Sequence, residues 1–205
     1  MGHRPKALLQ RDGEALLARQ LHLLDEAGIR RAVVVLGHHA QRLAPLLARI
    51  VAARPHMDVR SALNPRPDDG PGSSLRAGLA VLPAGLDGVA VLLADQPLLE
   101  AADVRAVLAA WRGRRAGIDL VVPTHGGQPG HPLVFGPAVR AAVARGQGGE
   151  GVREWRRAHA ARVQPLPVAH ARCTCDLDTP EDVARLATEQ AVVLTWAADG
   201  AENFE

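Results

Sequence analysis

The chain has 205 residues, of which 47% are hydrophobic and 22% charged, and its formal net charge at pH 7 is +2. These values are those of one sizeable globular domain, and the near-neutral charge gives no reason to expect nucleic acid or a membrane as a partner. No apolar run approaches the length of a membrane span, and the N-terminus lacks a signal-peptide core, so a cytoplasmic location is expected.

Segments with helical spacing of apolar residues alternate with short continuous apolar runs. Helices are expected over residues 12–27, 41–53, 73–82, 101–111, 137–145, 151–158 and 180–190. Strands are expected over residues 32–36, 57–62, 89–94, 119–123, 163–168 and 172–177. This alternation predicts an α/β fold with a mostly parallel sheet in one domain, residues 1–190, followed by a loosely held tail over residues 191–205.

The run Val89–Ala94 is the segment around which the other predictions are arranged. It fits a strand buried on both faces, and Asp95 follows at its carboxyl end. Ligands of open α/β sheets bind outside the carboxyl ends of the strands, where a carboxylate is well placed to hold Mg²⁺ on a phosphate. The alternative is that Asp95 only caps a turn or the following helix.

Three further segments carry chemistry that suits a nucleotide. Residues 72–78 open a helix with small side chains and free backbone N–H groups, and Ser73 or Ser74 is its expected N-cap. Lys6 lies in a loop and could meet a phosphate, although an exposed surface lysine is the usual case. Asp178 follows another expected strand and could form a metal clamp with Asp95, or could serve only as a cap.

The two cysteines, Cys173 and Cys175, are separated by one residue, and His170 lies nearby. This spacing could suggest zinc, but no second pair of ligands accompanies it. Two reduced cysteines on a strand are therefore the favoured interpretation.

Five motifs together resemble the MobA-like nucleotidyltransferases, and within them most closely the CTP:molybdopterin cytidylyltransferases. They occur in the order and spacing of that family and span about residues 1–188. The motifs are Met1-Gly2-x-Arg4-Pro5-Lys6-Ala7-Leu8-Leu9, Gly72-Ser73-Ser74-Leu75-Arg76-Ala77-Gly78, Ala94-Asp95-Gln96-Pro97, Gly130-His131-Pro132 and Asp176-Leu177-Asp178-Thr179-Pro180-Glu181-Asp182.

The resemblance implies a Rossmann-like nucleotide-diphospho-sugar transferase fold, Mg²⁺ as cofactor, an NTP substrate and release of pyrophosphate. It implies that Asp95 and Asp178 hold the metal and that Lys6 neutralises charge on the α-phosphate. The residues implied for the nucleotide are Asn64, Gly72, Ser73 and Ser74, and those for the acceptor are Gly130, His131 and Pro132. The implied acceptor is a phosphorylated small molecule such as molybdopterin cofactor, and a molybdoenzyme or its chaperone is a further partner that it suggests.

The chain departs from the family at its start. Family members begin with a strand and a Leu-Ala-Ala-Gly-x-Ser-x-Arg-Met-Gly loop, of which Met1-Gly2 correspond to the last two residues. A sheet without that first, central strand would leave backbone groups of two neighbouring strands unpaired, at about 1–3 kcal/mol for each buried group. A true start upstream of Met1 is the favoured expectation, and a degenerate member is the alternative.

The same departure leaves the base and the reaction open. The preference for CTP over GTP is based only on Asp95-Gln96-Pro97 and Gly130-His131-Pro132. A catalytically degenerate nucleotide- or cofactor-binding module is one alternative, and an oxidoreductase of the nicotine-blue type is another. No Gly-x-Gly-x-x-Gly fingerprint follows a strand in this sequence, which counts against the oxidoreductase.

Overall fold

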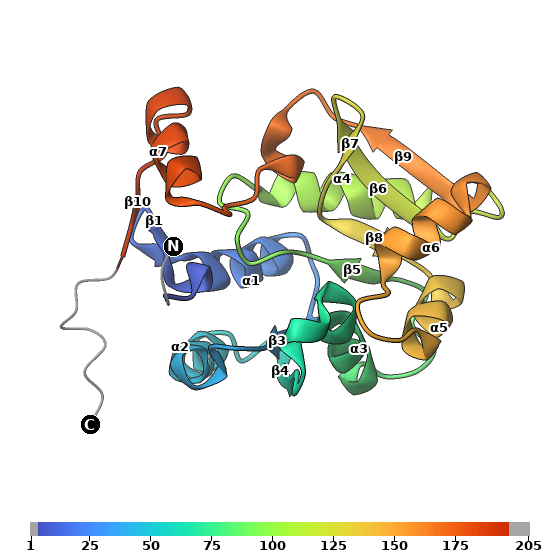
Figure 1. The fold of residues 1–205 in the computed structure, drawn as a ribbon, viewed down its shortest axis with the longest axis horizontal. Helices are drawn as coiled ribbons and strands as arrows, with labels where there is room; N and C mark the ends of the chain where they lie inside the picture. The colour runs from blue at the N-terminus through green and yellow to red at the C-terminus, as the bar shows by residue number, and fades with distance from the viewer. Residues whose placement is uncertain (1–3, 197–205) are drawn as a thin grey trace.

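A computed structural model describes residues 4–196 of the protein (Figure 1). The helices are α1 Leu16–Glu26, α2 Ala40–Ala52, α3 Pro71–Val81, α4 Ala101–Arg112, α5 Pro137–Arg145, α6 Val152–Ala158 and α7 Pro180–Glu189, with short 3₁₀ helices η1 Lys6–Leu8, η2 Pro67–Asp69, η3 Ala160–Arg162 and η4 Ala171–Thr174. The strands are β1 Gln10–Arg11, β2 Glu14–Ala15, β3 Arg31–Leu36, β4 Asp58–Leu63, β5 Val89–Val91, β6 Leu120–His125, β7 Gln128–Pro129, β8 Leu133–Phe135, β9 Val163–Pro167 and β10 Leu194–Thr195.

The strands form three sheets. β3 and β4 pair in parallel, from Arg31 with Asp58 to Leu36 with Leu63. The largest sheet has the order β5-β8-β6-β7, and β9 pairs in parallel with β6. Because β8 runs antiparallel to both β5 and β6, the sheet is mixed rather than mostly parallel as the sequence predicts. A small antiparallel sheet, β10-β1-β2, joins the two ends of the described chain.

Side chains of β6 alternate between the two faces of the largest sheet, and each face is covered by helices. Leu120 and Val122 pack in one cluster with Val139 of α5 and Trp155 of α6. On the other face, Val121 packs in a cluster with aromatic and aliphatic residues of α4. The core consists mainly of leucine, valine and alanine, as expected from the scarcity of aromatic residues.

The largest sheet and the β3–β4 pair do not join. Within residues 4–196, β3 pairs only with β4, and β5 pairs only with β8 (Figure 1). Accordingly Val33, Val34 and Val35 are only partly buried although they occupy the middle of a strand. The other edge of β3 and the other edge of β5 pair with no strand of residues 4–196.

Three predicted segments differ from the structure. The strand predicted over residues 89–94 ends at Val91. The helix predicted from Asp12 begins at Leu16, because β1 and β2 form a hairpin that turns at Asp12 and Gly13, both with positive φ. The segment over residues 172–177 is not a strand but η4 and an extended stretch. Strand β8, which was not anticipated, lies in a run of three residues that is too short to show a period.

Helix α3 begins at Pro71, with Gly70 at the N-cap, so neither Ser73 nor Ser74 caps it. Helix α7 begins as predicted: Thr179 is its N-cap and accepts a hydrogen bond from the backbone N–H of Asp182. The predicted tail contains β10, and Leu194 is buried, while residues 197–205 lie outside the described part of the chain.

Candidate functional site

Three charged side chains from distant parts of the sequence meet at one point. Lys6 Nζ donates a hydrogen bond to Asp178 Oδ1 at 2.8 Å and lies 3.6 Å from Asp95 Oδ2. The side chains of Lys6 and Asp95 are each 28% exposed, whereas Asp178 is 78% exposed. The structure therefore brings together the three residues for which the sequence analysis predicts charge neutralisation and metal binding.

Each of the three residues is held by a local turn. Lys6 opens η1, which follows Pro5. Asp95 lies in the loop after β5, and its carbonyl accepts a hydrogen bond from the N–H of Leu177 at 3.1 Å. Asp178 directly precedes the N-cap of α7, where its N–H donates to the Asp182 carboxylate. The segment around Leu177 thus links Asp178 to the loop of Asp95.

Burial and charge shift the pKa values of this group in opposite directions. Burial raises the pKa of Asp95 above its usual range, and the nearby Lys6 offsets only part of that effect. For Lys6 burial alone would lower the pKa, but the hydrogen bond to Asp178 and the charges of both aspartates raise it. Lys6 is therefore a permanent cation near neutral pH, and it stands where the two carboxylates converge.

Gln96 fixes the base of this site, a role that the sequence analysis did not assign. Its side chain is fully buried, and Nε2 donates to the carbonyl of Cys173 at 2.9 Å and to Asp176 Oδ1 at 2.7 Å. The backbone carbonyl of Gln96 accepts a hydrogen bond from Gln20 Nε2 of α1. Gln96 lies in a loop, where no periodic pattern of apolar residues indicates which side chains are buried.

The residues predicted to contact the nucleotide form a second group. Asn64 is buried, and Nδ2 donates to Ser73 Oγ at 2.8 Å and to Ser74 Oγ at 3.0 Å. Ser73 is also buried and bonds to the carbonyls of Arg66 and Gly70. Gly72 faces the loop between α5 and α6, because a Cβ there would lie 2.1 Å from the carbonyl oxygen of Glu150.

The predicted acceptor loop is attached to η4. The N–H of His131 donates to the carbonyl of Cys173 at 2.8 Å, the same carbonyl that Gln96 contacts. Gly130 packs so closely there that a Cβ would lie 2.1 Å from this oxygen. Burial, and secondarily the charge of Arg156, lowers the pKa of His131 to about 4, so its imidazole is neutral at pH 7. The peptide bond between His131 and Pro132 is cis.

The described residues contain no group of three or more histidine, cysteine, aspartate or glutamate side chains that could hold a metal ion. Cys173 and Cys175 are both free thiols, and burial raises both pKa values. They are reduced as expected, but they lie in and after η4 rather than on a strand. Asp95 and Asp178 are thus a pair of carboxylates that leaves the rest of any metal coordination to other ligands.

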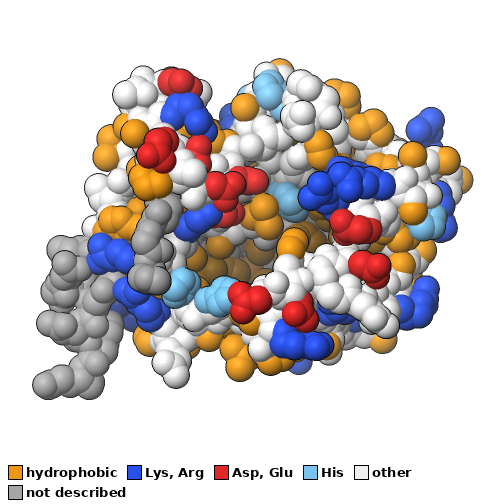
Figure 2. All heavy atoms as spheres, viewed as in Figure 1, with side chains coloured by type: hydrophobic (Ala, Val, Ile, Leu, Met, Phe, Trp, Pro, Cys, Tyr) orange, Lys and Arg blue, Asp and Glu red, His pale blue; other side chains and the backbone are white. Residues whose placement is uncertain are grey.

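The face of the molecule shown in Figure 2 is hollowed near its centre, with hydrophobic side chains on the floor and charged and histidine side chains around the rim. Within residues 4–196 no helix is long and apolar enough to cross a membrane.

The structure thus combines a mixed sheet, covered by helices on both faces, with a lysine–carboxylate cluster in the loop after β5, as the motifs imply. Residues 1–166 match the MobA-like NTP transferase domain. The chain belongs to this family.

Two solved structures and one group of relatives illustrate the similarity. The fold matches Rv0371c from Mycobacterium tuberculosis H37Rv with a TM-score of 0.69 and 27% identity, over 90% of each chain. A structure of Rv0371c in complex with manganese matches with a TM-score of 0.67 and 26% identity, over 90% of this chain and 92% of that one. The bifunctional protein GlmU of Mycobacterium avium (strain 104) is 33% identical over 162 residues, which are 76% of this chain but only 32% of GlmU.

A nucleotidyl transferase from Methanothermobacter thermautotroptrophicus shares the fold, with a TM-score of 0.66 at 20% identity, over 88% of this chain and 82% of that one. The chain therefore has the nucleotidyltransferase fold and spans about a third of the length of the GlmU relatives it matches.

Proposed function

We propose that the chain transfers a nucleoside monophosphate from an NTP, with CTP favoured over GTP, to a phosphorylated small-molecule acceptor such as molybdopterin cofactor. An oxygen of the acceptor phosphate attacks the α-phosphorus, and the bond from that phosphorus to the oxygen bridging to the β-phosphate breaks, so that pyrophosphate leaves. This chemistry needs positioning and charge neutralisation more than covalent help. The observation that carries the proposal is the convergence of Lys6, Asp95 and Asp178.

The donor set fits a hard divalent cation. Both carboxylates already direct an oxygen toward one positive charge, the Lys6 ammonium, at 2.8 and 3.6 Å. Two carboxylates with phosphate oxygens and waters are a common environment for Mg²⁺, and a metal bound there would neutralise phosphate charge. Asp95 and Asp178 would hold the ion, and Lys6 would approach the α-phosphate.

The remaining predicted residues would bind the two substrates. Ser74 is half-buried at the start of α3 and would contact the nucleotide, while the buried Asn64 and Ser73 would hold it in position. Gly130-His131-Pro132 would face the acceptor, and a neutral His131 could exchange a hydrogen bond with it without adding charge. The preference for CTP stays an expectation from the resemblance.

A degenerate binding module is the second candidate, because the described residues contain no group of three or more side chains that could hold a metal ion. The resemblance implies a Gly-rich loop ahead of the first motif, and each hydrogen bond from such a loop to a phosphate is worth about 1.5–3 kcal/mol, so we expect a protein that includes the loop to bind Mg·CTP and Mg·GTP more tightly than these 205 residues alone. Isothermal titration of this chain beside a version extended upstream tests that expectation. Equal, micromolar CTP affinity in both would show that the loop is dispensable.

The test of the metal role is Asp95→Asn. Because the substitution keeps the shape but removes the charge, we expect Mg²⁺-dependent CTP binding and any pyrophosphate release to fall at least about tenfold, with an unchanged fold. Asp12→Asn is the control, since Asp12 is an exposed turn aspartate with positive φ, which asparagine also tolerates. Undiminished binding and pyrophosphate release in Asp95→Asn would reduce Asp95 to a turn residue.

A further inference from the structure

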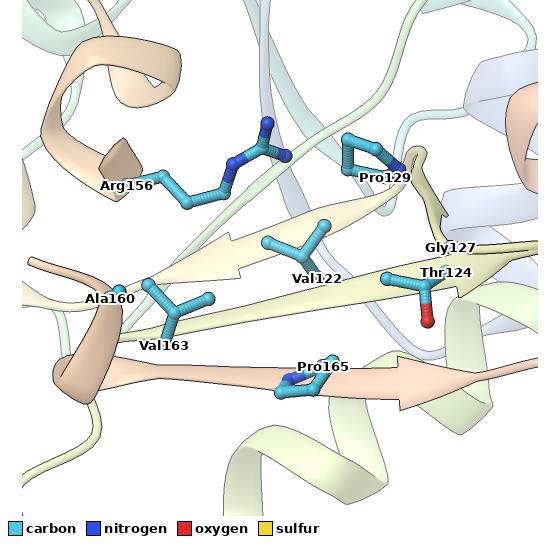
Figure 3. A pocket seen from close by; sticks show the side chains of 8 residues that line it. All are labelled: Val122, Thr124, Gly127, Pro129, Arg156, Ala160, Val163 and Pro165. Carbon is cyan, nitrogen blue, oxygen red and sulfur yellow. The ribbon is translucent and has the colours of Figure 1, made fainter.

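A pocket of about 360 Å³ opens on the face of the largest sheet that α5 and α6 cover, next to the predicted acceptor loop. Its floor and walls are mainly apolar, and Figure 3 shows its lining side chains arranged around Val122. The lining residues are Val122, Thr124, Gly127, Pro129, Arg156, Ala160, Val163 and Pro165. This volume is in the range of small-molecule sites, roughly 300–1,000 Å³, and far too small for a folded partner. We call it the Arg156 pocket.

Arg156 is the one cation among the lining residues. Its side chain extends from α6 over the pocket, with the guanidinium above Val122 and toward Pro129 (Figure 3). Within residues 4–196 this guanidinium makes no hydrogen bond or ion pair, whereas Arg140 and Arg172 each bond to two or more protein groups. A half-buried guanidinium over an apolar surface has its donors available and is suited to bind an oxyanion.

The pocket adjoins the segment that leads to His131. Gly127 lies in the turn between β6 and β7, and Pro129, which ends β7 and lies two residues before His131, is a further lining residue. Arg156 is also near enough to His131 to depress the pKa of its imidazole. A ligand in contact with Arg156 and Pro129 would therefore lie close to the segment that carries the neutral imidazole.

We propose that the Arg156 pocket binds the body of the acceptor, a compact organic group that rests on Val122, Val163 and Pro165 and presents an oxyanion to Arg156. The assignment of the ligand as the acceptor rests on the proposed function, whereas the chemistry of the pocket does not. Either a phosphate or a carboxylate could supply the oxyanion that Arg156 binds. Arg156 is then a residue that selects acceptors by charge.

Phenyl phosphate, benzoate, inorganic phosphate and phenol are the probes, each titrated into the purified 205-residue protein and followed by ligand-observed NMR. We expect phenyl phosphate to bind more tightly than inorganic phosphate, which lacks the apolar body, and phenol not to bind detectably. Benzoate separates a general oxyanion site from one that needs a phosphate. Because a hydrogen bond to a charged group contributes about 1.5–3 kcal/mol, Arg156→Gln should weaken phenyl phosphate about 10- to 100-fold.

Two further variants locate the site. Arg157→Gln removes an exposed arginine next in sequence, which does not line the pocket, and should leave phenyl phosphate binding unchanged. Ala160→Leu would fill the pocket and should weaken phenyl phosphate and benzoate together. Equal binding by Arg156→Gln and the unaltered protein, or an equal loss in Arg157→Gln, would overturn the proposal.

The failure of the two proposals can be told apart. Mg·CTP titrated into Arg156→Gln should bind as it does to the unaltered protein, because Lys6, Asp95 and Asp178 are intact. Binding of phenyl phosphate that depends on Arg156, in a version extended upstream that does not bind Mg·CTP, would support the pocket and contradict the proposed transfer. Binding of Mg·CTP without binding of phenyl phosphate or benzoate would overturn the pocket alone.

Discussion

Lys6 is the only lysine of the chain, and the structure gives it two carboxylate partners. In a protein whose other basic side chains are arginines and histidines, this single lysine between two aspartates is a compact point charge on a flexible stem. Its ammonium competes for the carboxylate oxygens that a divalent cation would need. The balance between these two cations is measurable.

We expect Lys6→Gln to bind Mn²⁺ several times more tightly than the unaltered protein, because the like charge beside the metal is gone. The same variant should bind CTP more weakly in the presence of Mn²⁺, since Lys6 no longer meets a phosphate. Titration of free Mn²⁺ by electron paramagnetic resonance measures the first effect. Lys6→Arg keeps the charge and is the control. Unchanged or weaker Mn²⁺ binding in Lys6→Gln would contradict the proposed metal position.

His131 makes the free energy of unfolding depend on pH. Its pKa is about 4 in the folded protein, against an ordinary value of 6.5, so between these pH values the unfolded chain binds a proton that the folded chain does not. The contribution of His131 to the free energy of unfolding is therefore fully present above about pH 6.5 and is lost as the pH decreases toward 4. At about 1.4 kcal/mol per pKa unit, the loss is up to roughly 3 kcal/mol.

His131→Gln cannot take up this proton. We expect the difference in unfolding free energy between the variant and the unaltered protein to change in favour of the variant as the pH falls from 7 to 4.5. Urea denaturation at several pH values measures this, and the use of a difference removes the contribution of the other titrating groups. A difference that does not depend on pH would show that His131 is not shielded from solvent.

Among the elements, η4 connects the predicted acceptor loop, Gly130-His131-Pro132, to the loop of Asp95. The carbonyl of Cys173 accepts hydrogen bonds from the N–H of His131 and from Gln96 Nε2, and Gly130 packs directly against it. Three segments that are far apart in sequence thus share one peptide group. A change at this junction should reach Asp178 through the chain that follows η4.

Gly130→Ala tests the junction. A Cβ would lie 2.1 Å from the oxygen of Cys173, and a backbone carbonyl cannot rotate away as a side chain can. We expect a loss of about 1–3 kcal/mol of stability, together with weaker Mn²⁺ binding. Gly113→Ala is the matched control, because its Cβ would lie 3.5 Å from the nearest atom and its φ is −92°. Equal destabilisation of both variants in urea would contradict the close packing.

At the scale of the whole molecule, the division between β3–β4 and the largest sheet is the feature with the clearest consequence. The register of β3 and β4, with bonds from Asp58 to Arg30 and from Asn64 to Leu36, directs the N–H groups of Val34 and Leu36 toward β4. The N–H groups of Val33 and Val35 point to the other edge, where no strand of residues 4–196 pairs with β3.

We therefore expect the amide hydrogens of Val33 and Val35 to exchange with solvent at least about tenfold faster than those of Val34 and Leu36. Neighbouring valines serve as mutual controls, because their intrinsic exchange rates are similar. Hydrogen exchange followed by NMR gives each rate separately. Equal protection of all four amides would mean that another segment covers this edge in solution.

The alternation of helical and strand-like runs was sufficient to predict most helices and their ends. Helix α5 matches its predicted range, and α7 begins at the Thr179 cap, because periodicity and capping are local properties of the sequence. The motifs likewise identified the family and the three residues that meet in the site. They could do so because their order and spacing resemble those of the family, and the resemblance implies one site for Lys6, Asp95 and Asp178.

The tertiary structure alone decided which strands pair and which polar groups are buried. Three apolar residues such as Leu133–Phe135 do not reveal that they form a strand antiparallel to both of its neighbours. The burial of Gln96 depends on contacts with Cys173 and Asp176, about 80 residues away along the chain, and the surroundings of Arg156 depend on residues of β6, β7 and β9. Strand pairing and burial arise from contacts between residues that are distant in sequence, whereas helix caps and hydrophobic periodicity depend on residues within a few positions of each other.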